Sequence, residues 1–329
     1  MTQSAAEHAR STAFAETVRA QVAKTVVGQT VVVERVLIAL LTGGHLLLEG
    51  VPGIAKTLLV QSVAKAIDLK FARVQFTIDL LPSDIVGSDI LDQRSGEFRV
   101  HKGPIFTNLL LADEINRASP KVQSALLEAM QERKVSIGST TYELPAPFLV
   151  IATQNPVEQA GTFELPEAQL DRFMLRHRLS YLSPADEADV VRRSLGLKLK
   201  RQGDGAVPMS AFDAIDEQSK LHISDLTTSM SRVLDVHVSE VFIRDCVELV
   251  NLTRTCPDIE LGCSPRAALS LVHASRARAF IHGRDYTVPE DFFALAEDVI
   301  LHRIRLNYDA LAAGKKPEQV LAGLLKSLA

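Results

Sequence analysis

The sequence contains no tryptophan, and only 5% of its 329 residues are aromatic. Lysine and arginine together number 36 against 40 acidic residues, which gives a formal net charge of −4. Dedicated nucleic-acid-binding proteins carry basic surfaces and aromatic platforms for bases, so this composition makes nucleic acid an unlikely partner. No apolar run reaches the 18 residues that a membrane span needs, and the polar segment 1–17 lacks a signal-peptide core. We therefore expect a cytoplasmic protein without a transmembrane segment.

Cysteine is also scarce, because the chain has only Cys246, Cys256 and Cys263, without a C-x-x-C spacing. The nine histidines show no H-x-x-x-H spacing. This pattern argues against a disulfide framework and against a zinc site, and it is typical of free thiols in a reducing compartment. Apolar residues make up 47% of the chain, which is enough to fill the cores of two domains.

The first part of the chain alternates between segments typical of strands and segments typical of helices. The predicted strands are Leu46–Glu49, Phe71–Thr77, Asn108–Ala112, Phe148–Thr153 and Leu175–Leu179. Most are nearly unbroken apolar runs, as expected for a parallel sheet that is buried on both faces. Predicted helices begin at Lys56 and at Ser119-Pro120. The alternation predicts a three-layer α/β domain over residues 1–182.

Two predicted hairpins interrupt this alternation, and from pattern alone they are surface decoration. The first pairs 89–92 with 97–100, and the second pairs 134–137 with 141–144. From residue 183 onward the strand signals fade, and several Ser or Thr residues stand before helix-like segments. Residues 183–329 therefore form a predicted all-α domain, with a loop at Arg201–Val207.

The most specific motif is Gly50-Val51-Pro52-Gly53-Ile54-Ala55-Lys56-Thr57, which follows the first predicted strand and opens a helix. Such a loop holds nucleotide phosphates with its backbone N–H groups, while Lys56 bridges two phosphates and the Thr57 hydroxyl ligates Mg²⁺. Ala55 stands where a second glycine is usual. The predicted nucleotide contacts in this segment are Gly50, Val51, Pro52, Gly53, Ile54, Ala55, Lys56, Thr57 and Leu58.

Polar residues follow two further predicted strands. Asp113 and Glu114 end the strand at 108–112, and Asn155 comes just after the strand at 148–153. Ligands of parallel α/β sheets bind at this end of the strands. We predict that Asp113 holds Mg²⁺, that Glu114 polarises the attacking water, and that Asn155 orients that water. A solvated acidic strand end is the alternative.

Two arginines are candidates for stabilising charge on the phosphate. Arg172 lies far from the phosphate loop in sequence, so it predicts either a finger that reaches a neighbouring subunit or an ion pair within the chain. Arg266 is predicted in the first turn of a helix, where a cation opposes the helix dipole. It indicates a nearby anion, or else an exposed residue that the helix tolerates.

With these motifs, the chain resembles the AAA+ ATPases and, among them, the MoxR family. The segments that carry the resemblance are the phosphate loop with its alanine, 112–118 with 123–132 as the Walker B region, 152–162 as sensor 1, 165–173 as the arginine-finger segment and 264–267 as sensor 2. The resemblance runs from Val27-Gly28 to beyond Arg305. It implies an AAA+ three-layer P-loop domain with hairpin inserts, followed by a helical lid. It also implies that Val27 and Gly28 lie near the adenine.

The resemblance further implies a ring, expected to be a hexamer, with ATP and Mg²⁺ bound between subunits. It implies hydrolysis of ATP to ADP and phosphate, with Arg172 or its rival Arg117 as the finger and Arg266 reporting the nucleotide to the lid. MoxR-type proteins act as chaperone-like factors that mature enzyme complexes, together with a partner that carries a von Willebrand factor type A domain. The client and that partner are therefore expected to be proteins.

Two other functions of the same clade stay open. One is a nucleic-acid motor in which Arg94, Arg99, His101 and Lys102 of the first hairpin face a pore, against which the acidic charge balance argues. The other is the motor subunit of a metal chelatase, although the chain lacks clusters of metal ligands. Residues Met209–Leu221 align with no motif, and residues 196–221 have no predicted role.

Overall fold

The computed structural model describes residues 2–51, 56–94, 96–156, 161–196, 199–202, 205–208, 215 and 220–328. For residues 2–12, 199–202 and 206–208 it describes the backbone only. Of the predicted phosphate loop, Pro52–Ala55 lie outside the described residues, and so does most of 209–219. Within the part that is described, no helix combines the length and apolar character needed to cross a membrane.

A five-stranded parallel sheet forms the centre of the first domain, with the strand order β2-β5-β8-β1-β9. Its strands are β1 (Leu46–Glu49), β2 (Phe71–Gln75), β5 (Leu109–Asp113), β8 (Leu149–Gln154) and β9 (Leu175–Arg178). All five sequence-predicted strands are confirmed, each within two residues at either end. Each of the inner strands β1, β5 and β8 is almost wholly buried, because helices cover both faces of the sheet.

Alternate residues of each strand enter two separate apolar cores. Leu46 and Leu48 belong to a core with the helices α1 (Thr2–Ala23), α2 (Thr30–Thr42) and α3 (Lys56–Ala66). Leu47 belongs to the core on the opposite face, which includes the helix α5 (Pro120–Glu132). The helices predicted at Lys56 and Ser119-Pro120 are confirmed, and their apolar stripes are buried. The register of the sheet therefore fixes which helix each strand residue contacts.

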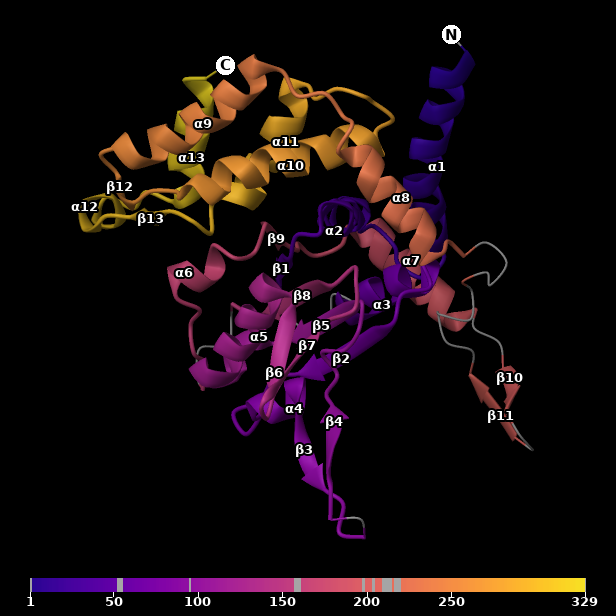
Figure 1. The fold of residues 1–329 in the computed structure, drawn as a ribbon. Helices are drawn as coiled ribbons and strands as arrows, with labels where there is room; N and C mark the ends of the chain where they lie inside the picture. The colour runs from indigo at the N-terminus through magenta and orange to yellow at the C-terminus, as the bar shows by residue number, and fades with distance from the viewer. Residues whose placement is uncertain are drawn as a thin grey trace.

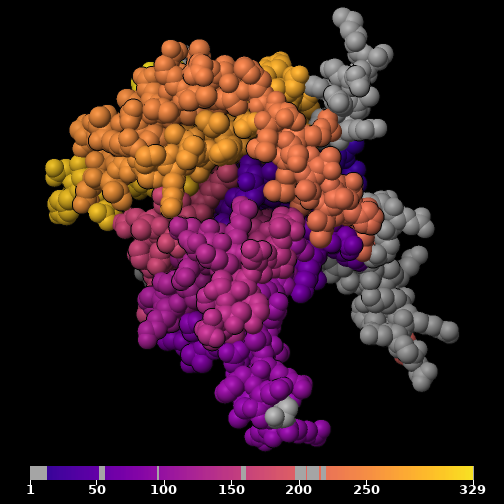
Figure 2. Space-filling view, viewed as in Figure 1, coloured from indigo at the N-terminus to yellow at the C-terminus, as the bar shows by residue number. Residues whose placement is uncertain are grey.

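The two predicted hairpins are also present. The first is β3 (Gly87–Leu91) with β4 (Phe98–Lys102), reached through the short helix α4 (Pro82–Val86), and it projects from the body of the molecule (Figures 1 and 2). The second is β6 (Lys134–Ile137) with β7 (Thr140–Glu143), which follows α5 directly.

The chain after β9 is mainly helical, and its part from residue 223 onward packs over α2 and β9 and beside α1 (Figure 1). Its helices are α7 (Pro184–Leu195), α8 (Ile223–Val233), α9 (Glu240–Thr255), α10 (Pro265–Ile281), α11 (Pro289–Ile300), α12 (Tyr308–Ala312) and α13 (Pro317–Lys326). The hydroxyls of Ser183, Ser239 and Ser264 accept the capping hydrogen bonds of α7, α9 and α10, as their sequence signatures predict.

Two features of this half differ from expectation. The loop predicted at Arg201–Val207 is wrong, because β10 (Leu199–Gln202) and β11 (Gly205–Pro208) pair as antiparallel strands. The lid also contains a short sheet of β12 (Ile259–Leu261) and β13 (Arg305–Leu306). Both are pairs of very short strands, which carry little periodic signal in a sequence.

Candidate active site

The predicted phosphate-binding lysine lies at the carboxyl edge of the central sheet. Gly50 and Val51 follow β1, and Lys56 is the first residue of α3. The Lys56 Nζ donates to the carbonyl of Gly50 at 2.6 Å and to that of Gln154 at 3.5 Å. Burial lowers the pKa of Lys56, whereas the charges of Asp113, Glu114 and Glu49 act to raise it. The structure therefore brings the lysine and the acidic pair together at one edge.

Asp113 is buried at the end of β5, and both of its carboxylate oxygens accept hydrogen bonds. The Thr153 hydroxyl donates to one oxygen at 2.6 Å. Arg73, on the neighbouring strand β2, donates to the other through Nε at 3.0 Å and Nη2 at 2.6 Å. These contacts fix the orientation of the carboxylate. Thr57, the other predicted magnesium ligand, lies in the first turn of α3.

These residues fit a magnesium ion by their donor chemistry. Asp113 supplies a carboxylate and Thr57 a hydroxyl, and Mg²⁺ is commonly held by one or two such oxygens together with substrate phosphates and water. Among the described residues there is no group of three or more His, Cys, Asp or Glu that could hold a metal by itself. The edge therefore suits an ion that arrives with a nucleotide.

Glu114, the predicted water activator, has a left-handed backbone with φ of 58°. Such a conformation costs a non-glycine residue of order 1 kcal/mol or more, so neighbouring contacts must hold it. Its N–H donates to the Thr153 hydroxyl at 2.8 Å. Its carboxylate accepts from Gln75 Nε2 at 2.9 Å and pairs with Arg117 Nε at 3.0 Å. Arg117, the rival candidate for the finger, therefore contacts the acidic residue of its own chain.

Asn155 follows β8, the strand that lies between β5 and β1. It is buried, and with Glu49, Asn116 and Arg176 it lines a hollow of about 260 Å³. Glu49 pairs with Arg176 at 2.7 Å across to the edge strand β9. Asn155 is thus placed between the acidic pair and the phosphate loop along the strand ends.

Val27 and Gly28, predicted to lie near the adenine, form the connection between α1 and α2. Gly28 has a φ of 70°, and a side chain there would come within 2.8 Å of the Asp186 carboxyl group. Only glycine suits both the angle and the close approach to α7. The segment is therefore fixed between α1, α2 and the first turn of α7.

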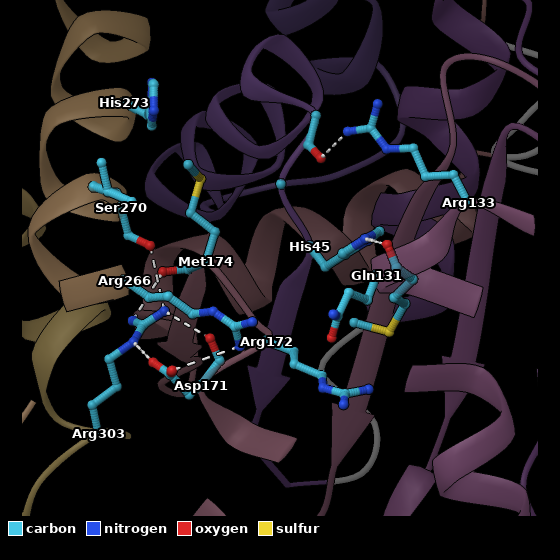
Figure 3. Close-up of a pocket in the computed structure, with 14 residues that line it drawn as sticks. His45, Gln131, Arg133, Asp171, Arg172, Met174, Arg266, Ser270, His273 and Arg303 are labelled. Atoms are coloured by element: carbon cyan, nitrogen blue, oxygen red, sulfur yellow. Dashed lines mark hydrogen bonds and ion pairs between the residues drawn. The ribbon is translucent and has the colours of Figure 1, made fainter. Parts of the chain in front are cut away.

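Arg172 and Arg266 lie together at the opposite, amino edge of the sheet. They line a hollow of about 300 Å³ with Gly44 and His45, which precede β1, and with Arg133 at the end of α5 (Figure 3). Lys56 comes after β1, so a strand of roughly 15 Å separates the two edges. No described residue forms an ion pair with the Arg172 guanidinium, so the alternative of an ion pair within the chain is not observed there.

Arg266 lies in the first turn of α10, where its Nη1 is 3.8 Å from a carboxylate oxygen of Asp171. Arg303 donates to the other oxygen of the same carboxylate at 2.7 Å. The hollow is thus lined by several guanidinium groups and one carboxylate, which favours an anion. The structure places Arg266 beside Arg172 rather than beside the phosphate loop of its own chain. The expected role of Arg266, which is to report the nucleotide to the lid, stays a prediction.

Four residues that contact the predicted site had no role in the sequence prediction. They are Arg73 and Gln75 on β2, Thr153 on β8 and Arg176 on β9. Their sequence signal is weak, because a polar residue in a strand does not show which neighbouring strand it will face.

A central parallel sheet with a phosphate loop after β1, acidic residues after β5 and a helical lid is the arrangement of a P-loop nucleoside triphosphatase. Comparison with known families agrees. Residues 45–175 match the family described as "ATPase family associated with various cellular activities (AAA)", and residues 251–323 match the AAA lid domain.

Individual relatives identify the family within this class of ATPases. The chain is 43% identical over 312 residues to the protein named Chaperone MoxR1 of Mycobacterium tuberculosis, covering 94% of this chain and 80% of that protein. It is 32% identical over 320 residues to Protein MoxR of Methylorubrum extorquens, covering 92% and 91%. A crystal structure of a protein assigned as an ATPase from Cytophaga hutchinsonii superposes with a TM-score of 0.84 at 43% identity, covering 98% of this chain and 97% of the other. The chain belongs to the MoxR family of AAA+ ATPases.

Proposed function

We propose that this protein is a Mg²⁺-dependent ATPase that hydrolyses ATP to ADP and phosphate. The observation that carries this proposal is the convergence of Lys56, Asp113 and Glu114 at one edge of the sheet. Lys56 binds the phosphates, and Thr57 and Asp113 hold Mg²⁺, which neutralises phosphate charge when it is bound. Glu114 accepts the proton of the attacking water, and Asn155 orients that water. Gly50–Leu58 hold the phosphates, and Val27 and Gly28 contact the base.

The contacts of Glu114 support its role as a positioned base. Gln75 and Arg117 both contact its carboxylate, so the side chain is held by hydrogen bonds rather than free in solvent.

We also propose that the protein works as a ring, expected to be a hexamer, in which Arg172 and Arg266 reach the nucleotide of the next subunit. Both arginines lie at the edge opposite Lys56, which supports action across an interface rather than within one subunit. In this proposal, the nucleotide that Arg266 reports to the lid is that of the next subunit. Arg117 is less suited to the finger role because it pairs with Glu114.

The biological role that we propose is chaperone-like remodelling of an enzyme complex, together with a partner that carries a von Willebrand factor type A domain. The relative from M. tuberculosis is named a chaperone. The projecting hairpin β3–β4 supports contact with a protein client, because Ile90, Leu91 and Phe98 are about half to two-thirds exposed on it. A nucleic-acid motor would instead show salt-dependent binding to DNA.

The central test is the substitution Glu114→Gln. This variant keeps the size and hydrogen bonding of the side chain but cannot accept a proton at neutral pH. We expect it to bind ATP with wild-type affinity and to lose nearly all turnover, measured as phosphate release with Mg²⁺ and with EDTA. Wild-type turnover in the variant would remove Glu114 from this role.

A further inference from the structure

Arg303 is a buried residue of the lid that contacts the backbone on both sides of Arg172. It follows α11 and is only 5% exposed. Its guanidinium donates to the Asp171 carboxylate at 2.7 Å, to the carbonyl of Phe173 at 2.7 Å and to that of Met174 at 3.3 Å. The segment that carries the proposed finger is therefore fixed by one side chain from the other domain.

The adjacent His302 adds to this attachment. Burial lowers its pKa well below the ordinary value, so the imidazole is neutral at physiological pH. Its Nε2 lies 3.1 Å from the Phe173 carbonyl oxygen. Because a carbonyl oxygen only accepts, the neutral ring must carry its proton on Nε2 to form this hydrogen bond.

Asp171 connects the same anchor to the start of α10. The Ser264 hydroxyl, at the N-cap of α10, donates to the second oxygen of the Asp171 carboxylate at 2.9 Å. Arg266, two residues later, is 3.8 Å from that oxygen. Asp171, the residue before Arg172, is therefore connected through its carboxylate to the helical turn that carries Arg266 (Figure 3).

The ion pair between buried Arg303 and partly buried Asp171 is better explained by the geometry that it imposes than by a contribution to stability. A buried pair typically contributes no more net stability than apolar residues of similar volume. A guanidinium, however, fixes its acceptors in a planar fork, so it determines where attached groups lie. Arg172 itself, between two anchored residues, has no ion-pair partner among the described residues.

We propose that Asp171 and Arg303 are positioning residues that hold Arg172, from the core, and Arg266, from the lid, as one unit toward the neighbouring nucleotide. This inference rests on the proposed function, in which Arg172 acts on the next subunit. Because the anchor joins core to lid, a displacement of the lid moves both arginines together. The anchor thus makes turnover in one subunit depend on the lid position of the next.

The test uses Asp171→Asn, which keeps the shape of the side chain and removes its charge. Because a misplacement of about 1 Å can cost on the order of 100-fold in rate, we expect turnover to fall about 10- to 100-fold. The affinity for ATP should not change, since the phosphate loop of the variant is intact. Arg303→Lys keeps the charge but loses the fork, so an intermediate loss is expected. The matched control is Glu318→Gln, which removes another core–lid ion pair, between Glu318 of α13 and Arg178 of β9, without touching Asp171 and should keep wild-type turnover.

Mixed rings separate positioning from general damage. Asp171→Asn subunits mixed with Lys56→Ala subunits should regain activity, because a finger from the second meets an intact nucleotide site in the first. Mixed with Arg172→Ala subunits they should show no gain in turnover, because every interface then has a defective finger. If Asp171→Asn were simply unfolded, neither mixture would gain turnover. Co-assembly is checked by size-exclusion chromatography with tagged subunits.

The outcomes are distinguishable. If Arg172→Ala and Lys56→Ala subunits assemble together and show no rescue, the proposed trans role of Arg172 fails. If they do rescue one another, but Asp171→Asn and Arg303→Lys keep wild-type turnover, only the positioning role is overturned. A gain in turnover when Asp171→Asn subunits are mixed with Arg172→Ala subunits would also overturn the positioning role of Asp171.

Discussion

The acid sensitivity of the fold can be predicted from His45, a buried residue directly before β1. Its Nδ1 accepts a hydrogen bond from the N–H of Val150 at 3.0 Å, and its Nε2 lies 3.1 Å from the carbonyl of Met130. Both bonds form together only with the neutral ring protonated on Nε2. Burial is the main cause that lowers its pKa from 6.5 to about 4.

The direction of the pH effect follows from proton uptake. In the unfolded chain the imidazole is protonated as the pH falls below 6.5, whereas in the folded protein it stays neutral down to about pH 4. The unfolded state then binds more protons, so acid favours unfolding. The contribution of His45 is complete above pH 6.5 and is lost between pH 6.5 and 4. At about 1.4 kcal/mol per pH unit, the loss amounts to roughly 3 kcal/mol.

The assay is urea unfolding of the wild type and of His45→Asn at several pH values from 4 to 7.5. Asparagine keeps a polar side chain but does not titrate. The difference in unfolding free energy between the two proteins should shrink by about 3 kcal/mol as the pH falls from 7 to 4, because contributions from all other groups cancel. A difference that does not change with pH would refute the reasoning.

Two further predictions concern other buried groups. Asp291 is fully buried and bonded to Arg278 and Arg284, and among the described residues only Arg278 has a second carboxylate partner, Glu34; Asp291→Asn therefore removes the ion-pair partner of Arg284 and should cost about 3–5 kcal/mol in urea unfolding at pH 7; a loss below 1 kcal/mol would contradict this account. Thr153→Val removes the hydroxyl that accepts from Glu114 and donates to Asp113; it should lower kcat in a phosphate-release assay more than it lowers ATP affinity, and an unchanged kcat would show that this hydroxyl does not orient the acidic pair.

Much of the fold was predictable because the buried strands are short apolar runs with clear boundaries. β1, β5 and β8 are each covered on both faces, so their sequences lack polar residues until the strand ends. The helix starts at Ser183, Ser239 and Ser264 were predictable for a local reason, since a capping hydroxyl needs only its own next few residues. The short pair β10–β11 was missed because four residues carry too little periodicity.

The contacts around the acidic pair were not predictable in the same way. Gln75 and Arg73 reach Glu114 and Asp113 because β2 is the neighbour of β5, a fact of strand order that local sequence does not encode. Arg176 meets Glu49 for the same reason, because β9 pairs with β1. Such pairs become visible only when the register is known.

The amino-acid sequence by itself determined the chemistry of the protein. It fixed a loop that ends in Lys56-Thr57, an adjacent pair of carboxylates and two arginines far from that loop. Those features depend on local order along the chain. The tertiary structure alone decided where the arginines lie, because the packing of α10 and Arg303 against the Asp171 segment brings residues 93 and 132 positions away to the Asp171 carboxylate. Contacts over such separations arise from the packing of two domains, and no short stretch of sequence specifies them.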